Sequence, residues 1–231
     1  MSSTSQGKGT KMIIGFVGFI GSGKDTAADY LVNSHGFRRD SFANTLKDAV
    51  SCVFGWDRTM LEGRTAASRE WRDQVDTWWA NRLDIPHLTP RWVLQYWGTD
   101  VLRKGFNDDI WIAALENKMR KTTDNIVISD VRFPNEIKAI RNSGGRVFRI
   151  KRGADPMWYE DARILNQGQT NMNWTMAKLK MAELKIHNSE WAWIGQKFDA
   201  EIDNNGTIDD FCQQIKNQVQ DHLVAKVNSG A

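Results

Sequence analysis

A glycine-rich stretch at residues 18–26, GFIGSGKDT, holds the residue types best suited to chemistry. The spacing G-x-x-x-x-G-K is typical of a loop that wraps around nucleotide phosphates. Glycines let the backbone approach phosphate oxygens, and the amide N–H groups and the N-terminus of the next helix attract the anion. Lys24 is expected to reach the β- and γ-phosphates. The residues predicted to bind ATP here are Gly21, Ser22, Gly23, Lys24, Asp25 and Thr26.

The position after Lys24 departs from the usual pattern. Most such loops place there the Ser or Thr that binds magnesium, whereas this chain has Asp25 followed by Thr26. The displacement favours a small-molecule kinase over a GTPase or a motor ATPase. A second acid, Asp130, ends the apolar run NIVISD at residues 125–130, where a carboxylate can organise Mg²⁺ directly or through water. Thr26 and Asp130 are therefore candidate magnesium ligands, and the choice of direct ligand stays open.

Arg132 lies two residues beyond Asp130 and supplies a cation at the same strand end. A guanidinium there can bind a substrate phosphate or stabilise the charge on a phosphoryl group in transfer. The alternative is a capping Asp beside a solvated Arg. The phosphate loop in the same chain favours the functional interpretation, in which Lys24, Asp130 and Arg132 form the catalytic group.

The elements around these residues alternate between strands and helices. Strands are predicted at residues 12–17, 37–42, 125–130, 146–150 and 200–203. Helices are predicted at residues 25–34, 45–54, 69–83, 91–98, 109–121, 134–143 and 207–224, with Thr89 and Thr207 as N-caps. Parallel strands need crossover helices, so this order predicts a three-layer α/β fold with a parallel central sheet and ligands at the carboxyl ends of the strands.

The domain boundaries follow from shifts in composition. Residues 1–11 are expected to form a disordered tail, residues 12–225 a single domain and residues 226–231 a C-terminal tail. Within the domain, residues 57–88 are interpreted as a substrate-side helical insertion and residues 153–186 as a mobile lid.

The composition narrows the classes of protein. With 231 residues and a net charge of +3, the chain suits a soluble globular domain without a strong electrostatic partner. It has no run of apolar residues that predicts a membrane span, and its two distant Cys fit a reducing cytoplasm. Most of the eleven Trp are expected to serve packing rather than base stacking. Lys and Arg are spread among acids, so no stable nucleic-acid complex is expected.

Five segments together resemble the phage-type deoxynucleoside monophosphate kinases. They are GSGKDTAADYL, FANTLKDAV, RWVLQYWGTDVLRKGFNDDIWI, ISDVRFPNE and IDNNGTIDDF, in that order. The resemblance covers most of residues 12–224 and is weak across residues 57–88 and 153–185. It implies the P-loop nucleoside monophosphate kinase fold, and transfer of the γ-phosphoryl of ATP, with Mg²⁺, to a deoxynucleoside 5′-monophosphate.

The resemblance also implies residue roles. Arg91 would grip the acceptor phosphate, Arg132 would bridge acceptor and donor, and Arg152 would close over ATP. Asn205 belongs to a loop that packs near the adenine. The remaining acceptor-site candidates are Lys47, Gln95, Gly98, Thr99 and Asp100. Lys47 fits an ordinary exposed residue equally well, and Arg64, Arg69 and Arg72 are interpreted as a solvated helix face.

Alternative functions remain open. One is a P-loop kinase of another acceptor, such as dephospho-coenzyme A or a ribonucleoside monophosphate. Another is a nucleic-acid-binding NTPase. The family also suggests a homodimer, working in the cytoplasm of an infected host if the chain is phage-encoded.

Overall fold

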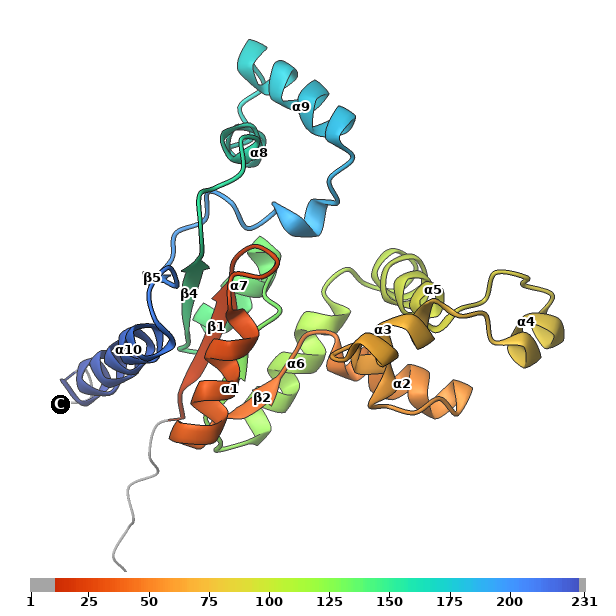
Figure 1. Cartoon of the computed structure of the whole chain (residues 1–231), viewed down its shortest axis with the longest axis horizontal. Coiled ribbons are helices and arrows are strands. Elements are labelled where there is room, and N and C mark those ends of the chain that lie inside the picture. The colour runs from red at the N-terminus through yellow and green to blue at the C-terminus, as the bar shows by residue number, and fades with distance from the viewer. Residues whose placement is uncertain (1–10, 229–231) are drawn as a thin grey trace, which may run out of the picture. The chain divides into compact units, whose positions relative to one another are not determined.

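The computed structural model describes residues 11–228, with side chains described as far as residue 220 (Figure 1). The expected disordered tail, apart from residue 11, lies outside the described residues, as do residues 229–231 of the expected C-terminal tail. The chain forms two compact units. One, the sheet unit, comprises residues up to 40 and from 121 onward, and the other, the helical unit, comprises residues 41–120.

The sheet unit contains five parallel strands in the order β2-β3-β1-β4-β5. They are β1 (Ile13–Val17), β2 (Arg38–Asp40), β3 (Ile126–Ile128), β4 (Arg146–Lys151) and β5 (Ala200–Asp203). All five were predicted, although β2 and β3 are shorter than expected. The chain leaves β1 toward one side of the sheet and returns to its other side with β4. This reversal creates a crevice at the carboxyl end of β1, the usual ligand position in such sheets.

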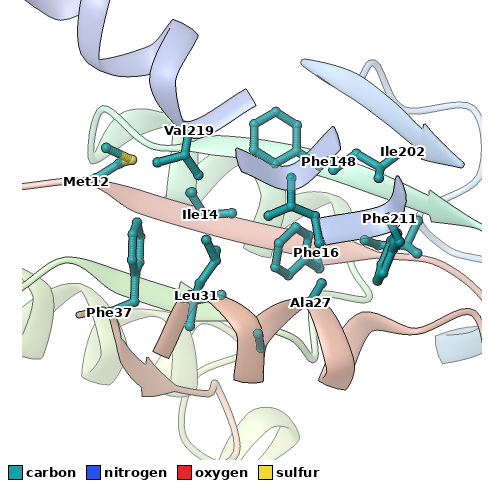
Figure 2. Close-up of a cluster of buried hydrophobic side chains, with 14 residues drawn as sticks. Met12, Ile14, Phe16, Ala27, Leu31, Phe37, Phe148, Ile202, Phe211 and Val219 are labelled. Carbon is teal, nitrogen blue, oxygen red and sulfur yellow. The ribbon is translucent and has the colours of Figure 1, made fainter. Parts of the chain in front are cut away.

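Helices α1 (Lys24–His35) and α10 (Ile208–Asn228) cover one face of this sheet, and α7 (Pro134–Asn142) covers the other. The helices α8 (Tyr159–Asn166), α9 (Met172–Leu184) and η3 (Asn188–Glu190) belong to the segment between β4 and β5, and α8 and α9 project away from the sheet (Figure 1). Side chains of α1 and α10 join those of β1 and β4 in one buried cluster, which includes Leu31, Phe16, Phe148 and Phe211 (Figure 2). α10 extends past the predicted end at residue 224 and includes residues 226–228. The residues expected to form a mobile lid contain two helices, α8 and α9, which pack against each other.

α7 covers the opposite face, and Gly15 of β1 allows it to pack close to the sheet. A Cβ added at Gly15 would lie 2.6 Å from Ile140 Cδ1 of α7. Strand side chains alternate between faces, so Ile14 and Phe16 enter the cluster shown in Figure 2 while Gly15 admits α7. The three-layer α/β prediction is confirmed.

The helical unit contains no strand within residues 41–120. Its elements are α2 (Asn44–Phe54), η1 (Met60–Glu62), α3 (Ala66–Asp73), α4 (Thr77–Leu83), α5 (Pro90–Gln95), the π-helix η2 (Tyr96–Lys104) and α6 (Ile110–Lys121). The single helix predicted over residues 69–83 is wrong, because Asp76 begins a new helix. Its carboxylate accepts a hydrogen bond from Trp79 N at 3.1 Å. Thr89 caps α5 as predicted, accepting from Trp92 N at 3.0 Å, and the chain continues as η2 to Lys104.

Tryptophans build the core of the helical unit. Trp56 and Trp111 are buried, and Trp71, Trp79, Trp92 and Trp97 pack against the same cluster. Phe54 and Trp56 stack with ring centroids 4.4 Å apart. The packing interpretation is therefore confirmed for these residues. Within residues 11–228, no helix combines the length and apolar character needed to cross a membrane.

Candidate active site

The glycine-rich loop joins β1 to α1 and has a backbone that only glycine adopts easily. Gly18, Gly21 and Gly23 have φ values of 146°, 76° and 106°. A Cβ at Gly18 would overlap the carbonyl oxygen of Ile150, and one at Gly23 would overlap the side-chain amide of Asn204. Gly23 is also the N-cap of α1 and offers no side-chain cap. The loop is therefore a tight cradle at an uncapped helix N-terminus, the local structure that binds phosphate.

Lys24 lies within this loop and is held by its backbone. Its Nζ donates hydrogen bonds of 2.7 Å to the carbonyl oxygens of Gly18 and Phe19. The pKa of Lys24 is lowered to about 8, mainly by burial and then by the nearby positive charge of Arg132, while the charges of Asp25 and Glu190 oppose the shift. The amine is thus a partly desolvated cation that an anion would stabilise.

A pocket of about 480 Å³ opens beside the loop. Asn204, in the turn after β5, braces it: its side-chain amide donates to Ser22 O at 2.8 Å and its N–H donates to Lys151 O at 2.8 Å. Asn205 Oδ1 accepts from Gly153 N at 2.7 Å. The pocket is lined by Gly21, Gly23, Lys24, Asp25, Thr26, Arg152, Asn204, Asn205, Gly206 and Ile208.

Most of the residues expected to bind ATP therefore line one cavity. Ser22 is the exception, because it is buried. Its N–H donates to Phe19 O at 3.2 Å, and its Oγ has no hydrogen-bond partner within the part of the chain that the structure describes. Of the sequence-predicted set, Arg152 and Asn205 come from segments remote from the glycine-rich loop, and the fold brings them to it.

Asp25 is tied to the ends of two strands. Its Oδ1 accepts hydrogen bonds from the guanidinium of Arg39 and, at 3.0 Å, from Ser129 Oγ. Arg39 also donates to Ser129 Oγ at 2.6 Å and pairs with Asp29 at 2.8 Å. Sequence reasoning did not identify Arg39 or Ser129. The only sequence signal for Ser129 was its position directly before Asp130 in the run ISD, residues 128–130.

Asp130 and Arg132 follow β3, as expected. Asp130 is half-buried. Arg132 Nη1 donates to Glu190 Oε1 at 2.6 Å and to Ser189 Oγ at 3.2 Å, both from η3. Glu190 also acts electrostatically on Lys24, so it belongs to the same charged group. No motif marked Glu190, which lies 58 residues from Arg132.

Apart from Arg132, the acceptor-site candidates lie in the helical unit. Two of the three charged ones there are neutralised by acids. Arg91 forms an ion pair with Asp73, and Lys47 Nζ lies 2.7 Å from Glu62 Oε2. Asp100 pairs with Lys104 at 2.7 Å on η2, and Gln95 and Thr99 are exposed. Gly98 is buried, and a Cβ there would lie 2.8 Å from Leu46 Cδ2.

The predicted solvated helix face needs one correction. Arg64 and Arg69 are exposed, as predicted, but Arg72 is half-buried. Its guanidinium packs over Gly63, where a side chain would collide with it. The absence of a Cβ at Gly63 therefore makes room for Arg72.

The donor set suits a magnesium nucleotide. No group of three His, Cys, Asp or Glu among residues 11–220 could hold a metal ion without other ligands. Mg²⁺ is usually bound by one or two carboxylates together with substrate phosphates and water. Thr26 and Asp25 line the phosphate pocket and Asp130 lies two residues after β3, so these oxygen donors suit a metal that arrives with a triphosphate.

Comparison with known proteins agrees with this geometry. Residues 62–176 match the family described as deoxynucleotide monophosphate kinase. A protein of Acanthamoeba polyphaga mimivirus that is assigned to this activity is 35% identical over 154 residues, which cover 61% of this chain and 74% of that protein. The chain belongs to the deoxynucleotide monophosphate kinase family. The resemblance inferred from the sequence motifs is therefore confirmed.

Other relatives of this kinase are more distant. The deoxynucleoside-5′-monophosphate kinase of Escherichia phage T5 is 24% identical over 181 residues, covering 57% of this chain and 72% of that enzyme. The shikimate kinase of Aquifex aeolicus is 13% identical with a TM-score of 0.43, covering 92% of this chain and 99% of that one. Family membership makes this chain a phosphotransferase that acts on small nucleotide substrates.

Proposed function

We propose that this kinase transfers the γ-phosphoryl group of ATP to a deoxynucleoside 5′-monophosphate and releases ADP and the deoxynucleoside diphosphate. The observation that carries the donor assignment is the glycine cradle with the half-buried Lys24 held by its backbone. Lys24 Nζ donates hydrogen bonds of 2.7 Å to two backbone carbonyl oxygens. Phosphate oxygens of ATP would replace these acceptors or share the ammonium with them. Because burial disfavours the charged form of Lys24, a bound phosphate anion would stabilise that form strongly.

The donor nucleotide is assigned to the pocket beside the loop. The amides of Gly21 to Thr26 hold the phosphates, and Arg152 supplies a cation at the pocket wall. Asn205 lies where the nucleoside end of ATP would leave the loop. Thr26 and Asp130 would hold Mg²⁺, which when bound neutralises charge on the β- and γ-oxygens.

The acceptor is assigned to the helical unit. Arg91 binds its 5′-phosphate, and Gln95, Gly98, Thr99 and Asp100 line the sugar and base end. Lys47 supplies a further cation once Glu62 yields to the substrate anion. The cations of this unit must exchange a carboxylate for a phosphate, so acceptor binding is expected to be salt-sensitive.

The transfer itself needs little proton chemistry. An oxygen of the acceptor phosphate, already anionic, attacks the γ-phosphorus, and the bond from that phosphorus to the β–γ bridging oxygen breaks, so ADP leaves with the electron pair. Lys24 and Arg132 stabilise the charge that spreads over the γ-oxygens. No general base is assigned, because the nucleophile carries no proton at neutral pH.

An acceptor panel tests this function. ADP release would be followed with the four deoxynucleoside monophosphates, their ribose counterparts and dephospho-coenzyme A, each with and without single-stranded DNA. The expected result is DNA-independent turnover of at least one deoxynucleoside monophosphate. Turnover of dephospho-coenzyme A or ribonucleotides alone, or hydrolysis that requires DNA, would instead establish one of the alternative functions.

The family resemblance also supports a homodimer in the cytoplasm of an infected host. Light scattering at micromolar concentrations would distinguish monomer from dimer. A mass equal to one chain would remove the dimer from the proposal without affecting the assigned reaction.

A further inference from the structure

Arg72 is a half-buried cation of the helical unit that forms no ion pair, although the charges of Asp73 and Glu62 favour its charged form from a distance. It lies near the end of α3, and its guanidinium rests on the backbone of Gly63. Among residues 11–220, no carboxylate lies close enough to form an ion pair with it. Nε is buried without a hydrogen-bond partner, and the bond from Nη1 to Leu61 O is long at 3.4 Å.

The other part-buried cations of the helical unit are treated differently. Lys47, 14% exposed, pairs with Glu62, and Arg58, 29% exposed, pairs with both Asp48 and Glu62. A half-buried guanidinium with unused donors is destabilising unless an anion completes its hydrogen bonds. The arrangement at Arg72 therefore leaves hydrogen-bond donors for an anionic ligand rather than a completed structural ion pair.

A second guanidinium lies close by. α3 packs against α5, and Asp73, the neighbour of Arg72 on α3, pairs with Arg91 on α5. The positive charge of Arg91 is, after burial, the main cause that lowers the pKa of Arg72. The carboxylates that oppose this shift, Asp73 and Glu62, are already paired with other cations. Two neighbouring guanidinium groups, of which only Arg91 has a carboxylate partner, suit an anion carrying more than one charge.

We propose that Arg72 and Arg91 together bind the 5′-phosphate of the acceptor nucleotide. A phosphate monoester is close to a dianion at neutral pH and has three terminal oxygens, enough for two guanidinium groups. Planar guanidinium groups bind phosphate through paired hydrogen bonds. This inference rests on the proposed function, because it assigns the acceptor phosphate to the same unit and adds a residue to its site.

Four variants test the inference: Arg72→Gln, Arg72→Lys, Arg91→Ala and the control Arg69→Gln. Arg69 lies on the same helix but is exposed, and its Nη1 donates to the carbonyl of Arg64 at 3.1 Å. The measurements are KM for the best acceptor of the panel, Kd for ATP, inhibition by the corresponding nucleoside, which lacks the phosphate, and the thermal unfolding midpoint.

The expected result is selective loss of phosphate binding. Arg72→Gln and Arg91→Ala should each raise the acceptor KM by about 10- to 100-fold, the effect of losing one charge-assisted contact. Arg72→Lys keeps the positive charge but lacks the paired donors of the guanidinium group. Its acceptor KM should lie between those of Arg72→Gln and wild type. Kd for ATP, inhibition by the nucleoside and the behaviour of Arg69→Gln should change by less than about twofold.

Two outcomes would overturn the inference. An acceptor KM in Arg72→Gln equal to that of wild type would show that Arg72 does not bind substrate. Equal weakening of ATP, nucleoside and acceptor binding, with a lower unfolding midpoint in both Arg72 variants, would show a structural role. By contrast, a wild-type enzyme that phosphorylates no deoxynucleoside monophosphate would overturn the proposed function itself.

Discussion

The lysine of the phosphate loop in the sheet unit and two acceptor-site cations of the helical unit are held in different ways. In the sheet unit, the backbone holds Lys24, whose ammonium donates to two carbonyl oxygens of the loop. In the helical unit, carboxylates hold Lys47 and Arg91 through ion pairs with Glu62 and Asp73. The first arrangement leaves the ammonium without a carboxylate in direct contact, whereas the second pairs each cation with one.

This difference has consequences for binding. Carbonyl dipoles orient an ammonium but cancel little of its charge, so an arriving triphosphate meets a preorganised cation. A carboxylate partner must be displaced by the acceptor phosphate, at a free-energy cost that lowers the net affinity. The donor site should therefore depend on one lysine and on its protonation, and the acceptor site on competition between anions.

Removal of Lys24 should give the largest effect. Lys24→Met should lower kcat by about a thousandfold or more, since one preorganised contact to the transferring phosphoryl is lost. The unfolding midpoint should not fall, because a desolvated charge is removed with it. Single-turnover kinetics and thermal unfolding would measure both.

The matched control is Lys138→Met, which removes an exposed lysine of α7. It should turn over like wild type. Near-normal phosphoryl transfer by Lys24→Met would contradict the assignment of the donor site.

The pH dependence of ATP binding should give an intermediate effect. Lys24 has a pKa of about 8 without nucleotide, and bound phosphates would raise it. Below pH 8 the amine is already charged and affinity should be nearly constant. Above pH 8 binding must take up a proton, so Kd should rise by up to about tenfold per pH unit until the pKa of the complex is reached.

Calorimetry between pH 7 and 9.5, in buffers of different ionisation enthalpy, would measure Kd and proton uptake together. Lys24→Arg provides the control, because a guanidinium stays protonated throughout this range. A flat wild-type profile, without proton uptake at pH 9, would refute the lowered pKa.

Removal of the competing carboxylate should give the smallest effect. Asp73→Asn frees Arg91 from an ion pair whose side chains are 41% and 54% exposed, and ion pairs this exposed to solvent are weak. The acceptor KM should therefore fall by about two- to fivefold. Steady-state kinetics at low salt would measure this decrease in KM. The control is Glu70→Gln, which neutralises another exposed carboxylate of α3. A higher KM in Asp73→Asn would mean that Asp73 orients Arg91 rather than competes for it.

Features set by local chemistry were predictable from the sequence. The apolar run of β1, the glycines of the phosphate loop and the cap at Thr207 each depend on neighbours a few residues away. Asp210 N donates to Thr207 Oγ1 at 3.2 Å, as an N-cap requires. These features position the donor site, so its residues could be proposed from the motif.

Features set by tertiary contacts were not predictable. The break between α3 and α4 carries neither Gly nor Pro, and it depends on the cap at Asp76. Contacts between residues far apart in the sequence produce no recognisable local pattern. Ser129 and Asp25 are 104 residues apart, and Arg132 and Glu190 are 58 residues apart. The environment of Arg72 depends on a glycine nine residues earlier and on a helix that follows much later.

The helical unit is one continuous segment of the chain, which begins directly after β2 and ends before β3. β2 and β3 are adjacent and parallel in the sheet, so the strand order depends on residues outside that stretch. On the proposed assignment of the acceptor to this unit, acceptor recognition would be encoded in one continuous segment. Recombination at its two borders would then exchange one acceptor preference for another while the residues of the phosphate loop are inherited unchanged.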